Sequence, residues 1–141
     1  MIALLSLKPE FAERIFDGTK RFEYRKRIFA REDVDKVIVY ATNPMKRIVG
    51  EFEFDEIILD TPASIWEKTS PYSGINRDRF FQYFLGKQKA YAISIKRAMR
   101  YRKPLNPRNM LPDFVPPQSF RYMATKESAL LNVGGEEQCH A

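Results

Sequence analysis

The order of its strand-like segments is the feature that most narrows the folds open to this chain. Residues 2–7 and 37–41 are short apolar runs typical of buried strands. Residues 21–26 and 48–60 alternate apolar and charged side chains, and residues 90–101 continue with apolar residues at a spacing of two. Helical spacing interrupts this order in only three places. A parallel α/β fold needs a helix after nearly every strand, so the sequence disfavours it.

Three short helices are predicted between the strands. The first begins at Pro9 and ends at Gly18, because proline is favoured in the first turn of a helix and glycine just after its end. The second follows the capping residue Thr61, and the third follows the capping residue Asn76. The sequence therefore predicts an α+β fold, a small β-barrel of about five to six strands with an N-terminal helix and two short inserted helices.

The composition is that of one globular domain without covalent or metal cross-links. The 141 residues fit a single domain, and a hydrophobic fraction of 44% predicts a packed core. Cys139 and His140 are the only residues of their kinds, so they cannot form an intramolecular disulfide or a zinc site with four protein ligands. No segment approaches the roughly 20 apolar residues of a membrane span. We expect a cytoplasmic monomer or homodimer with no membrane partner and no cofactor.

A proline-rich segment follows the last predicted strand. Residues 104–123 contain five prolines and cannot form a regular central strand or helix. We expect an extended wrap over the domain, anchored by Leu111, Phe114, Val115 and Phe120. The domain is predicted to cover residues 1–122, with residues 123–141 as a mobile C-terminal tail.

Positive charge gathers in two blocks. The net charge is +6, and residues 20–31 and 96–108 each carry six basic side chains, with Glu23 of the first block as the one acid between them. Two solvated strand ends would account for this, and so would a surface that binds a polyanion. Aromatic rings interleave both blocks, which favours binding because bases stack on such rings. The phosphate contacts predicted in the second block are Lys96, Arg97, Arg100, Arg102 and Lys103.

The most informative stretch is DGTKRFEYRKR, which begins at Asp17. It contains the pattern Gly18-x-Lys20-x-x-Glu23-x-Arg25, and a spacing of two places Glu23 and Arg25 on the same face of a strand. An arginine is suited to bidentate phosphate recognition, and a lysine can act as a base if burial lowers its pKa. The same three charges could instead form a salt-bridge cluster on an exposed face, with no role beyond neutralisation.

This pattern and the order of elements around it resemble the ASCH (activating signal cointegrator homology) domain family of the PUA-like superfamily, whose hallmark is GxKxxExR. The stretches SLKPEFAERI, VIVYATNPMKRIVGEFEFDEI and PPQSFRY are similar to those of its short members, and the resemblance covers residues 1–122. It implies a PUA-like β-barrel with a cleft between barrel and helices, a fold shared with RNA-binding and RNA-modifying modules. Members of this kind are described as transcriptional regulators or RNA-binding proteins.

The resemblance also implies which residues work. The motif match transfers the family's functional positions to Lys20, Glu23 and Arg25. Similar stretches, and side chains able to bind a base or a phosphate, add the ligand-binding candidates Lys8, Tyr40, Thr42, Gln118 and Ser119. We therefore expect a basic cleft that binds nucleic acid, with RNA or another single strand as the partner.

A small hydrolase acting on RNA or on a modified nucleoside is the alternative, with Lys20 and Glu23 as the catalytic residues. One branch of the family hydrolyses acetylated cytidine, and Lys20 matches its lysine. Glu23 stands where that branch has a threonine nucleophile, however, and no glutamate is present around Ser73 or Gly74. A ribonuclease keeps the same cleft without that requirement. Whether the protein is an enzyme stays open at the level of the sequence.

Two further interpretations carry less weight. Glu51, Glu53 and Asp55 could supply oxygen ligands to a divalent metal of a nuclease, but three acids at a spacing of two also describe the solvent face of an edge or barrel strand. We therefore predict no metal site. An adaptor that binds proteins through the proline-rich residues 113–117 also stays open.

Overall fold

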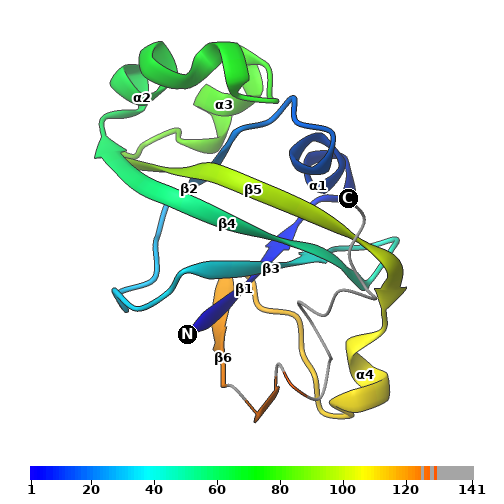
Figure 1. Ribbon diagram of the computed structural model, residues 1–141. Coiled ribbons are helices and arrows are strands. Elements are labelled where there is room, and N and C mark those ends of the chain that lie inside the picture. Colours follow the sequence, from blue (N-terminus) through cyan, green and yellow to red (C-terminus); the bar gives the residue numbers. More distant parts are fainter. Residues whose placement is uncertain (125, 128, 130–141) are drawn as a thin grey trace.

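The computed structural model describes residues 1–124, 126, 127 and 129, which form an α+β fold around one six-stranded sheet. The strands lie in the order β2-β5-β4-β3-β1-β6, and the sheet curls into a half-barrel (Figure 1). In chain order the elements are β1 (Ile2–Leu7), α1 (Pro9–Phe16), β2 (Phe22–Arg25), β3 (Lys36–Ala41), β4 (Arg47–Asp60), α2 (Pro62–Thr69), the 3₁₀ helix η1 (Ser70–Tyr72), α3 (Arg77–Tyr83), β5 (Ala90–Leu105), α4 (Pro107–Met110) and β6 (Phe120–Met123). The predicted fold class is confirmed.

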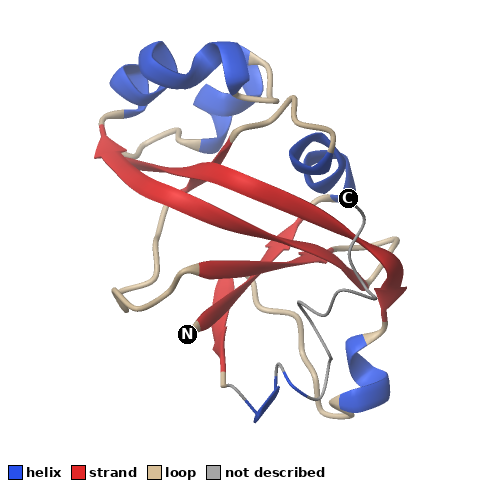
Figure 2. Cartoon of the chain, in the orientation of Figure 1, coloured by secondary structure: helices blue, strands red, loops and turns tan. Residues whose placement is uncertain are grey.

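Two long strands form the spine of the sheet. β4 and β5 pair antiparallel over 14 and 16 residues, and their register shifts between Glu53 and Phe54 and again before Ile57. Such bulges bend and twist a strand pair, so they allow this sheet to curl. Figure 2 shows α2 and α3 together at one end of the β4–β5 pair and α4 at the other. Among the pairs of described strands, only β1 and β3 run parallel.

The helices α2 and α3 begin where the sequence predicts. The Thr61 hydroxyl accepts from the Ser64 N–H at 3.2 Å, and the Asn76 side chain accepts from the Arg79 N–H at 2.8 Å. Each cap satisfies a backbone donor that has no partner within the helix. Phe80 of α3 is fully buried and meets other aromatic rings, among them Trp66 at 4.9 Å between ring centroids. Phe80 also packs against Tyr24 of β2, with ring centroids 4.8 Å apart, so this pair of helices is fixed onto the β2 side of the sheet. None of the helices among the described residues is long and apolar enough to cross a membrane.

The proline-rich segment packs over the sheet, as predicted, but not with all its expected anchors. Phe114 is buried against Tyr40, with ring centroids 5.5 Å apart, whereas Val115 is 71% exposed. The segment also contains the one-turn helix α4, which was not predicted, and it ends in the edge strand β6. Met123 closes that strand and is buried. Most of the predicted tail, residues 125, 128 and 130–141, lies outside the described residues.

The acids of β4 do not all lie on the solvent face that their spacing predicts. Glu51 is fully buried, whereas Asp55 of the same strand is exposed. The Glu51 carboxylate accepts from the Tyr101 hydroxyl at 2.8 Å and pairs with the Lys36 ammonium at 2.8 Å. Glu53 instead pairs with Arg97 at 3.3 Å. Within the described part of the chain, no three acidic, cysteine or histidine side chains are grouped as a metal site would require.

Replacing Tyr101 by Phe should destabilise the protein by about 2 kcal/mol, because it removes a hydrogen bond to the fully buried carboxylate of Glu51. Urea denaturation checks this. Tyr91→Phe on the same strand is the control, since Tyr91 is only partly buried and makes no described side-chain hydrogen bond. Equal midpoints for the two variants would show that the Glu51 contact contributes nothing.

Candidate functional site

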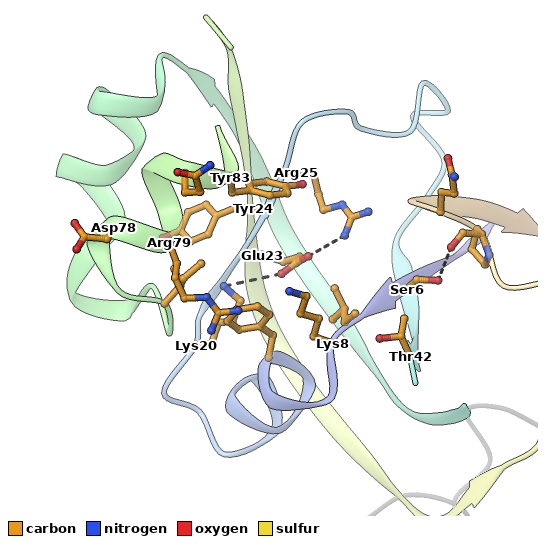
Figure 3. Close-up of a pocket in the computed structure, with 16 residues that line it drawn as sticks. Ser6, Lys8, Lys20, Glu23, Tyr24, Arg25, Thr42, Asp78, Arg79 and Tyr83 are labelled. Atoms are coloured by element: carbon orange, nitrogen blue, oxygen red, sulfur yellow. Dashed lines mark hydrogen bonds and ion pairs between the residues drawn. The ribbon is translucent and has the colours of Figure 1, made fainter. Parts of the chain in front are cut away.

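A cleft with a volume of about 890 Å³ opens between α1, β2 and α3. One further wall is formed by the end of β1 and by residues 117–118 of the returning segment. Figure 3 shows Lys20, Glu23 and Arg25 in a row across the cleft, joined through the glutamate. The three residues of the sequence motif therefore lie together in one cavity.

Local geometry brings Lys20 into this position. Gly18 ends the first helix at φ +87°, a conformation that L side chains rarely adopt, and the Lys20 N–H then bonds back to the Arg14 carbonyl at 2.9 Å. The ammonium of Lys20 donates to the Ser73 carbonyl at 2.8 Å. Gly74 makes this approach possible, because a Cβ there would lie 2.4 Å from the Cβ of Lys20.

The charged trio is buried. Exposed fractions are 3% for Lys20, 5% for Glu23 and 8% for Arg25. One oxygen of Glu23 lies 3.1 Å from the Arg25 guanidinium, and the other lies 3.9 Å from the Lys20 ammonium. The interpretation of these charges as a salt-bridge cluster on an exposed face is therefore wrong. A buried cluster of this kind is destabilising to assemble unless its groups are well paired, so it needs a reason beyond surface neutralisation.

Burial changes the proton affinity of the lysine. Removal from water lowers the pKa of Lys20 to about 8 from its ordinary value of 10.5, with a smaller lowering by Arg14 and an opposing effect of Glu23. The ammonium also lies 4.6 Å from the centre of the Tyr24 ring. Tyr24 itself donates to or accepts from Thr69 at 2.7 Å, and burial raises its pKa to about 12, so its phenol stays neutral. Lys20 is thus charged at neutral pH and can lose its proton in mild base.

Arg25 connects the trio to the returning segment. Its guanidinium donates to the Ser119 hydroxyl at 2.7 Å. Ser6 fixes that segment on β1, because its hydroxyl donates to the Pro117 carbonyl at 2.7 Å and its N–H donates to the Ser119 carbonyl at 3.2 Å. The Nε of Arg25 is buried without a hydrogen-bond partner in the described part of the chain. Such a donor is costly to leave unpaired, so a ligand oxygen reaching this nitrogen would be stabilised.

The remaining predicted ligand residues divide into two groups. Lys8, Thr42 and Gln118 line the cleft, and Ser119 reaches it through Arg25. Tyr40 does not line it. Its ring is buried with Phe114 in a separate apolar cluster.

The second basic block lies outside the cleft. Of its predicted phosphate contacts (Lys96, Arg97, Arg100, Arg102 and Lys103), none lines the cavity. Arg97 is paired with Glu53, and Arg100 is paired with Glu13 of α1 at 2.7 Å. The block therefore forms a separate surface along the second half of β5, where two of the five charges are already neutralised.

Sequence reasoning missed one wall of the cleft. Arg79, Gln82 and Tyr83 of α3 line it. Their spacing of three and four residues places them on one face of the helix, opposite the buried Phe80 and Phe84. A helical projection of residues 77–84 could have predicted this wall. Phe80 and Phe84 define the buried side of the helix, and Arg79, Gln82 and Tyr83 lie on another side.

Comparison with known proteins defines the family to which this fold and cleft belong. Residues 5–104 match the ASCH domain family, so the chain belongs to that family and has its PUA-like fold. It is similar to a protein from Zymomonas mobilis named ASCH domain-containing ribonuclease, with 29% identity over 135 residues that cover 92% of this chain and 88% of that protein. The crystal structure of ASCH from Zymomonas mobilis superposes with a TM-score of 0.84 at 26% identity and covers 93% of each chain.

Another similar protein differs in size. A protein from Ureaplasma parvum named large ribosomal subunit protein uL22 is 33% identical over 122 residues. The match covers 85% of this chain but only 38% of that protein. The chain thus spans well under half the length of this relative.

The free energy of unfolding should rise with pH between about 8 and 9.5, with a slope of at most about 1.4 kcal/mol per pH unit. In this window the unfolded chain still binds the Lys20 proton, whereas the folded chain has begun to release it, so higher pH favours the fold. Urea melts at several pH values check the slope. Lys20→Met should lack this component, and equal slopes for the two proteins would contradict the lowered pKa.

Proposed function

We propose that this protein binds single-stranded RNA in the cleft and cleaves the RNA backbone there. The observation that carries the proposal is the buried row of Lys20, Glu23 and Arg25 in a cavity of about 890 Å³. The similarity to a protein named as a ribonuclease over 92% of the chain supports cleavage as well as binding. Two cations around one carboxylate supply the charges that backbone cleavage needs.

The cleavage step follows from the chemistry of the three groups. The 2′-oxygen of a ribose attacks the adjacent phosphorus, and its proton passes to the Glu23 carboxylate. Arg25 and Lys20 stabilise the extra negative charge on the phosphoryl oxygens. The bond from phosphorus to the 5′-oxygen then breaks, and the leaving oxygen takes a proton from Lys20. With a pKa of about 8, Lys20 can give up this proton near neutral pH far more readily than an ordinary lysine.

Binding without cleavage is the first alternative, and it uses the same cleft. The exposed basic surface of residues 96–103 could then guide the strand by long-range attraction, although it does not line the cavity. Hydrolysis of an acetylated nucleoside has less support. A serine and a glycine stand where the branch of the family that hydrolyses acetylated cytidine has its glutamate, and neither has a carboxylate. Ser73 is buried with its hydroxyl donating to the Ile75 carbonyl, and Gly74 packs against Lys20.

Purified protein should cleave a 5′-labelled single-stranded RNA, and Lys20→Ala and Glu23→Gln should each reduce the rate by about 100-fold or more, as loss of a proton-transfer group does. Product separation on a denaturing gel measures this. Arg97→Ala, on the separate basic surface, is the matched control and should keep nearly full activity. Undiminished cleavage by Lys20→Ala would remove the trio from the mechanism.

The pH profile tests the role of the lysine. If Lys20 is the proton donor, the rate should fall as pH rises through about 8, because the group is then losing the proton that it must supply. A rate that rises through the same pH would make Lys20 the base and would reverse the roles assigned to it and to Glu23.

Glu23→Gln also separates a site residue from a counter-charge. If Glu23 orients Lys20 and Arg25 for the ligand, the variant should bind a non-cleavable 2′-O-methyl RNA less tightly, even though its net charge is more positive. A fluorescence anisotropy titration measures this affinity. Tighter binding with no preference among RNAs would leave Glu23 as a neutralising charge only.

A further inference from the structure

Positive charge converges on one aromatic ring at the rim of the cleft. The ring of Phe11, from α1, lies 4.8 Å from the Arg79 guanidinium, 5.5 Å from the Lys20 ammonium and 5.6 Å from the Arg14 guanidinium. The distance between the Arg79 guanidinium and the Lys20 ammonium therefore cannot exceed the sum of their distances to the ring centre. Both also line the cavity, and Figure 3 shows them on the same side of it. Such a grouping of like charges favours an anion between or beside them.

Glu10 is the acid that pairs with the two arginines of this group. Its carboxylate lies 3.0 Å from the Arg79 guanidinium and 3.8 Å from that of Arg14. All three side chains are about two-fifths exposed, and an ion pair in that setting contributes little to stability. Arg14 has a second role, because it donates to the Gly74 carbonyl at 2.8 Å and so holds the loop against Lys20. Among the described residues, Arg79 is held at the cleft by Glu10 and by stacking on Phe11 alone.

We propose that Arg79 is a second phosphate-binding residue of the cleft, and that Glu10 occupies its guanidinium until a ligand phosphate takes the place of the carboxylate. This inference rests on the proposed binding of RNA. Stacking on Phe11 keeps the guanidinium in position while its anionic partner changes, so the exchange needs no movement of the backbone. The exchange replaces one charge-assisted pair with another, and a phosphate offers more acceptor oxygens to the guanidinium fork than the single contact of Glu10.

The geometry defines the ligand more narrowly. One phosphate lies over Lys20 and Arg25, where the buried donors are, and a neighbouring phosphate of the same chain reaches Arg79. A nucleoside offers neither contact, and a mononucleotide offers only one. The cleft is therefore suited to an oligonucleotide that continues past the cleaved bond towards α3.

The experiment compares opposite ends of one ion pair. The probe is a fluorescein-labelled 2′-O-methyl RNA of eight nucleotides, and anisotropy titrations give its affinity for wild type, Arg79→Gln, Glu10→Gln and the double variant. Arg79→Gln should weaken binding about fivefold. Glu10→Gln should tighten binding by a similar factor, because breaking an exposed ion pair of the stronger kind frees Arg79 for the phosphate. In the Arg79→Gln background, Glu10→Gln should have no more effect than the loss of another exposed negative charge.

Glu56→Gln is the matched control, because Glu56 is exposed with no described partner and its loss changes the net charge equally. The proposal is overturned if Glu10→Gln and Arg79→Gln shift affinity in the same direction, as a purely structural ion pair would. It is also overturned if Glu10→Gln has no more effect than Glu56→Gln. Wild type that binds the probe but never cleaves ordinary RNA would reject the ribonuclease proposal alone, since the affinities of the variants still decide the role of Arg79. Wild type that does not bind the probe would overturn both.

Discussion

The Lys20 ammonium donates to the Ser73 carbonyl from a position almost withdrawn from water, and the rest of the cleft is arranged around that contact. Withdrawing a charge from water costs several kcal/mol, which the carbonyl, the Tyr24 ring and Glu23 offset in part. The same loss of hydration lowers the pKa of the lysine, so the lowered pKa and the cost in folding free energy have one origin. Gly74 is the condition for both, since a side chain there would push the loop away from Lys20.

Much of the architecture could be predicted because it depends on local rules. The period-two alternation located the strands, and Thr61 and Asn76 located the starts of two helices through backbone donors that need a partner. The spacing of Glu23 and Arg25 correctly placed both on one face of β2. Their depth was not predictable, because burial is decided by α3 and by the segment around residue 119, which pack over that face from distant parts of the chain.

Two residues, Glu51 and Tyr40, are more buried than the sequence pattern suggests, and for the same reason. Alternation identifies one face of a strand but not what covers that face. Glu51 has the sequence context of a solvent-facing acid, yet Tyr101 of β5 and Lys36 of β3 hold its carboxylate in a buried position. Tyr40 is a polar aromatic at the end of a strand, where a ligand contact is plausible, yet Phe114 covers it. Only the tertiary arrangement distinguishes these outcomes.

The bond between Arg25 and Ser119 joins residues 94 positions apart. During synthesis the chain emerges from its N-terminus, so Lys20, Glu23 and Arg25 leave the ribosome long before the segment that forms the opposite wall. Until then Arg25 lacks its serine partner, and Ser6 lacks the carbonyl of Pro117 that it donates to. A nascent chain therefore carries the charged residues before one wall of the cleft exists, and the cleft is complete only when the returning segment docks on β1.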